Sequence, residues 1–205
     1  MIAIVNYGSG NVQAICNIYN RLGIPHAVAS TSEQIHAGDK IILPGVGAFD
    51  QAIGELEKSG LRAALDEVVL RQGRPMLGIC VGMQLLANGS EEGTQRGLGW
   101  INGEVKKFDR TNFPQADRLP HMGWNTAASA RTSPLLKDVD LEQGFYFLHS
   151  YYFACADRQD ELMHTSYGGR YASAVNRGNI YGVQFHPEKS HQAGIQLLKN
   201  FAFHV

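Results

Sequence analysis

The stretch Pro75-Met76-Leu77-Gly78-Ile79-Cys80-Val81-Gly82 decides the fold of this chain. Its apolar run follows a break at Arg74-Pro75, which predicts a buried strand. The next segment, Met83-Gln84-Leu85-Leu86-Ala87, predicts a helix that stops at Asn88-Gly89. Cys80 therefore lies at a strand-to-helix junction, where flanking glycines allow a sharp turn and the close approach of a substrate.

This position suits a nucleophile, because the start of a helix favours a thiolate over a thiol. A free cysteine is more often a small buried hydrophobe than a reactive group. From this segment alone, both interpretations of Cys80 stay open.

The first half of the chain alternates strand-like and helix-like segments. Leu61, Leu65, Val68 and Val69 share one face of a helix that should end at Gly73. Strands separated by helices predict a mostly parallel sheet covered on both faces. The other expected elements are strands at Ile2–Asn6, His26–Ala29 and Lys40–Leu43, and a helix from Asn11 to Leu22 that stops at Gly23.

The second half differs, because short strand-like runs alternate with turns rich in Gly, Asp and Asn. A last helix is expected at about Ala193–Phe203. The whole pattern predicts one α/β domain over residues 1–205, with three layers and a largely parallel sheet that antiparallel strands extend in the C-terminal half. The predicted strands here are Val105–Phe108, Phe145–Ala154, Glu161–Tyr167, Tyr171–Asn176 and Ile180–Gln184.

Composition excludes several classes of function. The 18 basic and 19 acidic residues give a net charge of -1 without a basic block, so neither nucleic acid nor membrane is an expected partner. The apolar runs are strand-sized, and Met1–Val5 has no signal-peptide pattern. Cys16, Cys80 and Cys155 are odd in number and far apart, which favours a reducing, cytoplasmic setting over a disulfide framework. No ligand spacing predicts a metal site.

A thiolate needs a base, and the best candidate lies in Phe185-His186-Pro187-Glu188. Pro187 favours an extended backbone at His186, so the side chains of His186 and Glu188 point to one side. A carboxylate that orients an imidazole is the arrangement used with Cys and Ser nucleophiles. The simpler alternative is a histidine at a strand end beside a solvated glutamate.

An acyl-transfer site also needs donors for an oxyanion. The glycine-flanked turn Gly45-Val46-Gly47 follows a predicted buried strand, and the N–H of Val81 adjoins the candidate nucleophile. Taken alone, this turn is also compatible with an ordinary glycine-rich loop. Neither a P-loop nor a dinucleotide fingerprint is present, so no cofactor is expected.

Together these segments resemble the class I (triad) glutamine amidotransferases, and more closely the glutaminase subunits of imidazole glycerol phosphate synthase. The resemblance covers essentially the whole chain. One departure is Val81, where Leu is usual. The segments that carry the resemblance are, in order, Asn6–Asn11, Leu43–Phe49, Gly78–Leu86, Pro120-His121-Met122-Gly123-Trp124-Asn125, His149-Ser150-Tyr151 and Phe185–Ser190.

The resemblance implies a chemistry for each matched residue. Cys80 would attack the side-chain amide of glutamine and form a thioester, His186 would protonate the departing ammonia and activate water, and Glu188 would orient His186. The implied contacts to glutamine are Gln84, Gly47 and the backbone of Ser150-Tyr151. A peptide within Pro44–Gly47 is expected to reorient before its N–H can meet the oxyanion.

The resemblance also implies a partner, a (β/α)₈-barrel cyclase subunit that receives the ammonia. Met122 and Trp124 would instead be core residues if their strand were buried. Alternative functions are the glutaminase subunit of a pyridoxal phosphate synthase, a stand-alone cysteine hydrolase, and a catalytically inactive binding module. The residues implied at the partner interface are Pro120, Met122, Trp124, Asn125, Tyr146 and Lys189.

Overall fold

Parallel strands form the centre of the molecule. The computed structural model describes residues 1–109, 111 and 119–205. Every residue of the central strands β1, β4 and β13 is buried, because helices cover both faces of the sheet. The parallel strands lie side by side in the order β2 (His26–Ala29), β1 (Ile2–Val5), β3 (Lys40–Gly45), β4 (Met76–Cys80) and β13 (Ile180–Val183).

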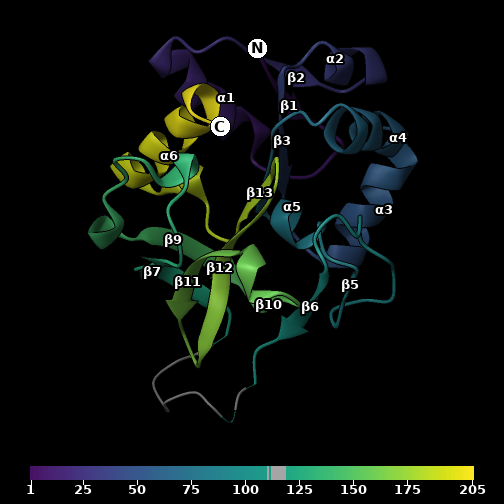
Figure 1. Ribbon diagram of the computed structural model, residues 1–205. Coiled ribbons are helices and arrows are strands. Elements are labelled where there is room, and N and C mark those ends of the chain that lie inside the picture. Colours follow the sequence, from purple (N-terminus) through teal and green to yellow (C-terminus); the bar gives the residue numbers. More distant parts are fainter. Residues whose placement is uncertain (110, 112–118) are drawn as a thin grey trace.

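The helices form the two outer layers. Figure 1 shows α1 and α6 on one side of the parallel strands and α3 and α4 on the other. The sequence reasoning missed α2 and α3, although Phe49, Ala52, Ile53 and Leu56 are buried at helical spacing. The helices are α1 (Val12–Leu22), α2 (Ser32–His36), α3 (Phe49–Ser59), α4 (Arg62–Asp66), which continues into a π-helical turn (Glu67–Arg71), α5 (Val81–Gln84) and α6 (His191–Phe203).

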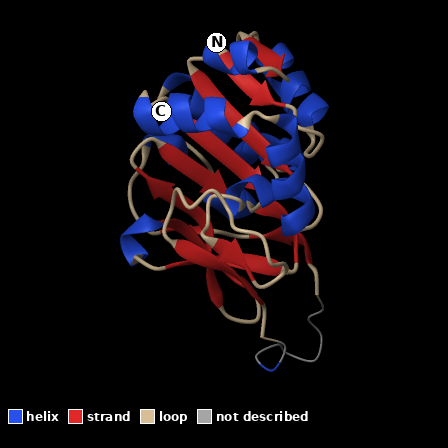
Figure 2. Ribbon diagram, turned by 90° about the vertical axis from the view of Figure 1, so that its right-hand side faces the viewer, coloured by secondary structure: helices blue, strands red, loops and turns tan. Residues whose placement is uncertain are grey.

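Antiparallel strands extend the sheet beyond β13, as predicted. Figure 2 shows both termini at one end of the molecule, far from most of these strands. The extension runs β12 (Arg170–Arg177), β10 (Tyr151–Cys155), β6 (Gly103–Lys107) and β5 (Gly89–Ser90), of which only β5 is parallel to its neighbour β6. β11 (Glu161–Ser166) lies beside β12, and β8 (Ala128–Ser129) lies beside β11. Short 3₁₀ turns lie at Pro134–Leu136, Leu141–Gln143, Arg158–Asp160 and Pro187–Lys189.

The strand predicted over Phe145–Ala154 is two strands. β9 (Phe145–His149) pairs with β7 (His121–Asn125) in a separate two-stranded sheet, whereas β10 belongs to the main sheet. The break falls at Ser150. A continuous run of strand-forming residues does not reveal such a change of partner, because the pairing depends on segments far away in sequence.

The helix predicted over Met83–Ala87 begins earlier and is shorter. It starts directly after Cys80 and ends at Gln84. The carbonyls of Leu85 and Leu86 accept hydrogen bonds from Leu98 and Ile101 at 2.7 and 3.1 Å. These hydrogen bonds from the loop that carries Leu98 and Ile101 replace the intrahelical hydrogen bonds that a longer helix would make.

Close backbone contact fixes the turn around Cys80. A Cβ on Gly82 would lie 1.9 Å from the Leu43 carbonyl oxygen, and one on Gly45 would lie 2.5 Å from the Gly82 nitrogen. A Cβ on Gly78 would lie 2.6 Å from the Gly82 carbonyl oxygen. Only glycine lets strand β3 and the turn after β4 approach this closely.

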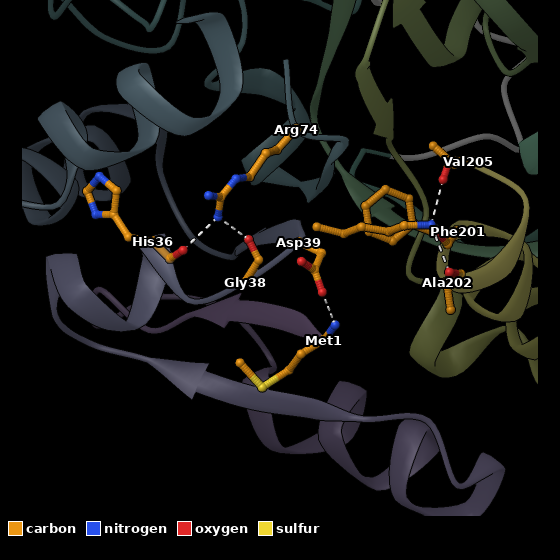
Figure 3. A network of polar contacts seen from close by, with 9 residues as sticks. Met1, His36, Gly38, Asp39, Arg74, Phe201, Ala202 and Val205 are labelled. Carbon is orange, nitrogen blue, oxygen red and sulfur yellow. Dashed lines mark hydrogen bonds and ion pairs between the residues drawn. The ribbon is translucent and has the colours of Figure 1, made fainter. Parts of the chain in front are cut away.

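A lysine ties the C-terminal helix to the sheet (Figure 3). The Lys40 ammonium donates to the carbonyls of Phe201, Ala202 and Val205 at 3.1, 2.7 and 2.5 Å. A cation at this end of a helix satisfies carbonyls that lack intrahelical donors and complements the helix dipole. The C-terminal end of α6 is thereby anchored to β3, at the end of the helix opposite His186 and Glu188.

The close approach at Gly82 yields a stability prediction. We expect Gly82→Ala to lower the free energy of unfolding by about 3 kcal/mol, because the new Cβ would overlap a backbone oxygen. In the control, Gly54→Ala, the added Cβ would meet only the Gln95 side chain at 3.6 Å, within helix α3. That change should be neutral or stabilise by about 0.5–1 kcal/mol. Denaturant unfolding of both variants measures the difference, and equal effects would contradict the interpretation.

Candidate active site

The turn between β4 and α5 presents Cys80 in a strained conformation. Its φ of 55° and ψ of -113° lie in a region that residues with a Cβ rarely adopt. The side chain is nearly buried, yet it lines a pocket. The predicted junction is therefore confirmed, and its geometry is that of a nucleophile elbow.

His186 and Glu188 form the predicted local pair, but the extended segment from which it was predicted is wrong beyond His186, because Pro187–Lys189 form a 3₁₀ turn. The Nδ1–H of His186 donates to Glu188 Oε1 at 2.8 Å, and both side chains are buried. The same oxygen accepts from the Asn11 amide at 2.8 Å. The simpler alternative of a solvated glutamate is excluded by this burial.

Electrostatics in this pair favour an imidazolium beside a carboxylate. Burial alone would lower the pKa of His186, but hydrogen bonding to Cys80 and Glu188 outweighs it and raises the pKa to about 10. Burial alone would raise the pKa of Glu188, but the hydrogen bond from His186 and its positive charge hold it below the usual range. The three side chains thus meet in one place, from opposite halves of the sequence.

A cavity of about 480 Å³ opens over the Cys80 and His186 side chains. This volume is in the range of sites for small ligands. Gly45 packs beneath the turn and Glu188 lies behind His186, so neither lines the cavity. Predicted residues that do line it are Val46, Gly47, Val81, Gln84, Pro120, Ser150, Tyr151 and Lys189.

The amide of Gln84 is held by the protein itself. Its nitrogen donates to the Tyr151 carbonyl at 3.1 Å and to Gln184 Oε1 at 3.0 Å. Gln184 in turn donates to the sulfur of Cys80 at 3.9 Å. Both amide hydrogens of Gln84 are used, which leaves its oxygen as a possible acceptor for a donor group of a ligand.

Two of these partners were missed by sequence reasoning. Gln184 is fully buried, and a polar residue at the end of the apolar strand Ile180–Val183 was a usable signal. Asn11 belongs to the segment Asn6–Asn11 that carries the family resemblance, but nothing in the sequence places it beside Glu188, 177 residues away.

The candidate oxyanion donor at Val46 is engaged. Its N–H donates to Ser9 Oγ at 3.0 Å, and the same hydroxyl donates to the Val46 carbonyl at 2.9 Å. Gly47 follows with a φ of +89°. The Val46 N–H is therefore not free for an oxyanion in this conformation.

The two-stranded sheet of β7 and β9 exposes an apolar face. Met122 and Trp124 are 64% and 49% exposed and pair with Leu148 and Tyr146. The alternative that they are core residues is excluded. Lys189 lies over the Tyr146 ring at 5.6 Å.

The side chain of Asn125, predicted at the partner interface, makes contacts within the fold. It donates to the Ser166 carbonyl at 3.1 Å and contacts His121 at 3.3 Å. The alternation of a strand places Asn125 with His121, on the face opposite Met122 and Trp124. Leu148, in contrast, lies on the exposed face and was not predicted.

Neither a metal-binding cluster nor a membrane-spanning helix occurs in the described residues. In the ranges 1–109, 111 and 119–205, no group of three or more His, Cys, Asp or Glu side chains is placed to hold a metal ion. None of the helices in that part of the chain is long and apolar enough to cross a membrane.

Comparisons with known proteins agree with this geometry. The family "Glutamine amidotransferase class-I" matches residues 3–205. "Imidazole glycerol phosphate synthase subunit HisH" of Bdellovibrio bacteriovorus is 50% identical over 98% of this chain and 99% of its own, and that of Leptospira borgpetersenii is 47% identical with the same coverage.

Solved structures with little sequence identity share the fold. PurLQS of Thermotoga maritima has a TM-score of 0.73 at 14% identity, covering 98% of this chain and 96% of that one. The glutaminase domain of Trypanosoma brucei CTPS has a TM-score of 0.66 at 17% identity, with coverage of 98% and 92%.

The buried pair predicts how His186 titrates. Because its pKa of about 10 lies above the ordinary 6.5, protonation stabilises the fold fully below pH 6.5, and this contribution is lost as the pH rises towards 10. We expect Glu188→Gln to lower the pKa of His186 by about 1 to 3 pH units. NMR titration of the histidine ring nitrogens measures this, with the exposed Glu142→Gln as control. A wild-type imidazole that loses its proton below pH 7 would refute it.

Proposed function

Because the chain belongs to the class-I glutamine amidotransferases, and within them to the HisH subunits of imidazole glycerol phosphate synthase, we propose that it hydrolyses glutamine to glutamate and ammonia. The observation that carries this proposal is the meeting of Cys80 and His186 at one cavity, with Glu188 bonded to the imidazole from behind. Residues 1–205 would act as one amidotransferase domain.

The proposed reaction proceeds through a thioester. The sulfur of Cys80 attacks the side-chain carbonyl of glutamine, and the imidazolium of His186 gives its proton to the leaving ammonia. The neutral imidazole then takes a proton from water, whose oxygen attacks the thioester and releases glutamate. Glu188 holds the ring by its Nδ1–H throughout, so that the other nitrogen faces the sulfur.

The Gln84 oxygen and the backbone of Ser150-Tyr151 would hold the amino-acid end of glutamine. Three free cysteines, one of them catalytic, fit a reducing compartment such as the cytoplasm.

Charge development on the carbonyl oxygen requires two donors. The N–H of Val81 would be one. The other would come from the Val46 peptide after it leaves Ser9 and turns inward, a rotation that Gly45 and Gly47 permit. Such a step would keep the isolated chain nearly inactive.

Ammonia released in water near pH 7 would be protonated and lost as a nucleophile, so it needs a sealed route. The names of the HisH relatives imply a second subunit. We propose a (β/α)₈-barrel cyclase that uses the ammonia to form imidazole glycerol phosphate and an aminoimidazole carboxamide ribotide in histidine biosynthesis. These relatives favour this partner over a pyridoxal phosphate synthase.

The exposed face of Met122, Trp124, Tyr146 and Leu148 would meet that subunit. Lys189 and Pro120, which line the cavity, would lie at its rim. An apolar patch with aromatic anchors is typical of a specific interface.

Replacement of Cys80 should separate glutamine hydrolysis from the synthesis that uses the ammonia. In the complex with the cyclase subunit, we expect Cys80→Ala to lower glutamine-dependent synthesis about 10³-fold or more, because no thioester can form. Synthesis from added ammonium salt should stay within about twofold, because it bypasses Cys80.

Cys155→Ala is the matched control, since Cys155 is a half-buried cysteine outside the cavity. Both activities of that variant should be normal. Glutamine-dependent synthesis that survives in Cys80→Ala would overturn the proposed mechanism.

The apolar face predicts the site of association. We expect Trp124→Ala to raise the Kd for the cyclase subunit by about 30-fold, equivalent to about 2 kcal/mol. Phe203→Ala is the control, because Phe203 is also exposed but lies on α6. Titration calorimetry measures both, and equal affinities would place the interface elsewhere.

A further inference from the structure

A second buried polar cluster lies outside the proposed triad. His121 of β7, His149 of β9 and Tyr171 of β12 are 3%, 7% and 3% exposed. The Tyr171 hydroxyl lies between the two imidazoles, 3.0 Å from His121 Nδ1 and 3.3 Å from His149 Nε2. None of the three has a role in the chemistry described above.

The Tyr151 carbonyl oxygen, at one end of this cluster, fixes the donor and the acceptor of each hydrogen bond described here. His149 Nδ1 lies 2.8 Å from the Tyr151 carbonyl oxygen, which can only accept, so this nitrogen carries the proton. In a neutral ring the Nε2 is then an acceptor, and Tyr171 donates to it. The Tyr171 oxygen accepts from His121 Nδ1, which leaves His121 Nε2 to accept from the Asn125 amide at 3.3 Å.

Both rings are neutral in this arrangement. Burial lowers the pKa of His121 to about 4 and that of His149 to about 3, the latter also because of the neighbouring His121. His121 is stacked between Phe147 and Tyr167, with ring centroids at 4.7 and 3.9 Å. This packing excludes water and holds the ring plane.

The chain of donors ends at the wall of the cavity. The Tyr151 carbonyl accepts from both His149 and Gln84, so both of its lone pairs are engaged. Gln84 continues through Gln184 to the sulfur of Cys80. The Ser150-Tyr151 backbone, where the chain passes from one sheet to the other, is thus held from both sides.

We propose that Asn125, His121, Tyr171 and His149 form one directed chain of hydrogen bonds that positions the Tyr151 carbonyl, and with it the Ser150-Tyr151 backbone that binds glutamine. Tyr171 is the central positioning residue, because its hydroxyl both accepts and donates. The proposal rests on the proposed function, since it assigns this chain to the binding of glutamine rather than to bond breaking.

The test removes a single oxygen. In the complex with the cyclase subunit, Tyr171→Phe should raise the KM for glutamine about 3- to 10-fold, the value of one hydrogen bond, with kcat within about twofold. Tyr152→Phe is the matched control, because its ring packs 5.9 Å from that of Tyr171 but is not part of the chain. Its KM should not change.

A second pair of variants tests the last bond. In His149→Asn the side-chain amide can still donate a hydrogen bond towards the Tyr151 carbonyl, whereas the side chain in His149→Leu cannot. The KM for glutamine should therefore be lower in His149→Asn than in His149→Leu. Ring-nitrogen NMR of the unmodified protein should show His121 and His149 both protonated at Nδ1. Tyr171→Phe should move the His121 Nδ1 resonance, because its acceptor is gone, whereas Tyr152→Phe should not.

An Nε2-protonated ring at either histidine, an unchanged KM in Tyr171→Phe, or an equal rise in Tyr152→Phe would overturn the proposal. If the unmodified complex did not hydrolyse glutamine, the proposed function would fail, and the NMR arm would still decide whether the directed chain exists.

Discussion

The structure depends on a close backbone approach at the end of the central strands. Gly82 lies so near the Leu43 carbonyl that a methyl group would not fit, and Gly45 lies against the Gly82 nitrogen. This contact holds Cys80 in a conformation that a residue with a side chain adopts only under constraint. The sulfur is thereby aimed into the cavity instead of packing in the sheet.

The imidazole of His186 and the carboxylate of Glu188, both buried, come to Cys80 from the C-terminal part of the chain. β13 pairs directly with β4, which brings His186 to the same edge of the sheet as Cys80. The pair is stable in a buried place because each charge has a partner and the carboxylate has a second donor in Asn11. One nitrogen of the imidazole is thus fixed on Glu188 and the other remains for chemistry.

The passage from β9 to β10 joins the exposed apolar face to the cavity. Alternate residues of β7 and β9 point to opposite faces of their two-stranded sheet. Met122, Trp124 and their partners on β9 face outward, whereas the residues between them face the buried polar cluster. Ser150 lies at the point where the chain leaves one sheet for the other. The cavity wall at Ser150-Tyr151 is therefore continuous in sequence with the strand that carries part of the exposed face.

Local sequence determined the alternation of strands and helices, the turn at Cys80 and the extended backbone at His186, because glycine, proline and apolar periodicity act over a few residues. It did not determine the break at Ser150, the early end of α5, or the contacts of Asn11, Gln184 and Tyr171. The side-chain contacts of Asn11, Gln184 and Tyr171 join residues 22 to 177 positions apart. Only the packed fold decides which distant donor meets which acceptor, since a polar side chain in sequence carries no information about its partner.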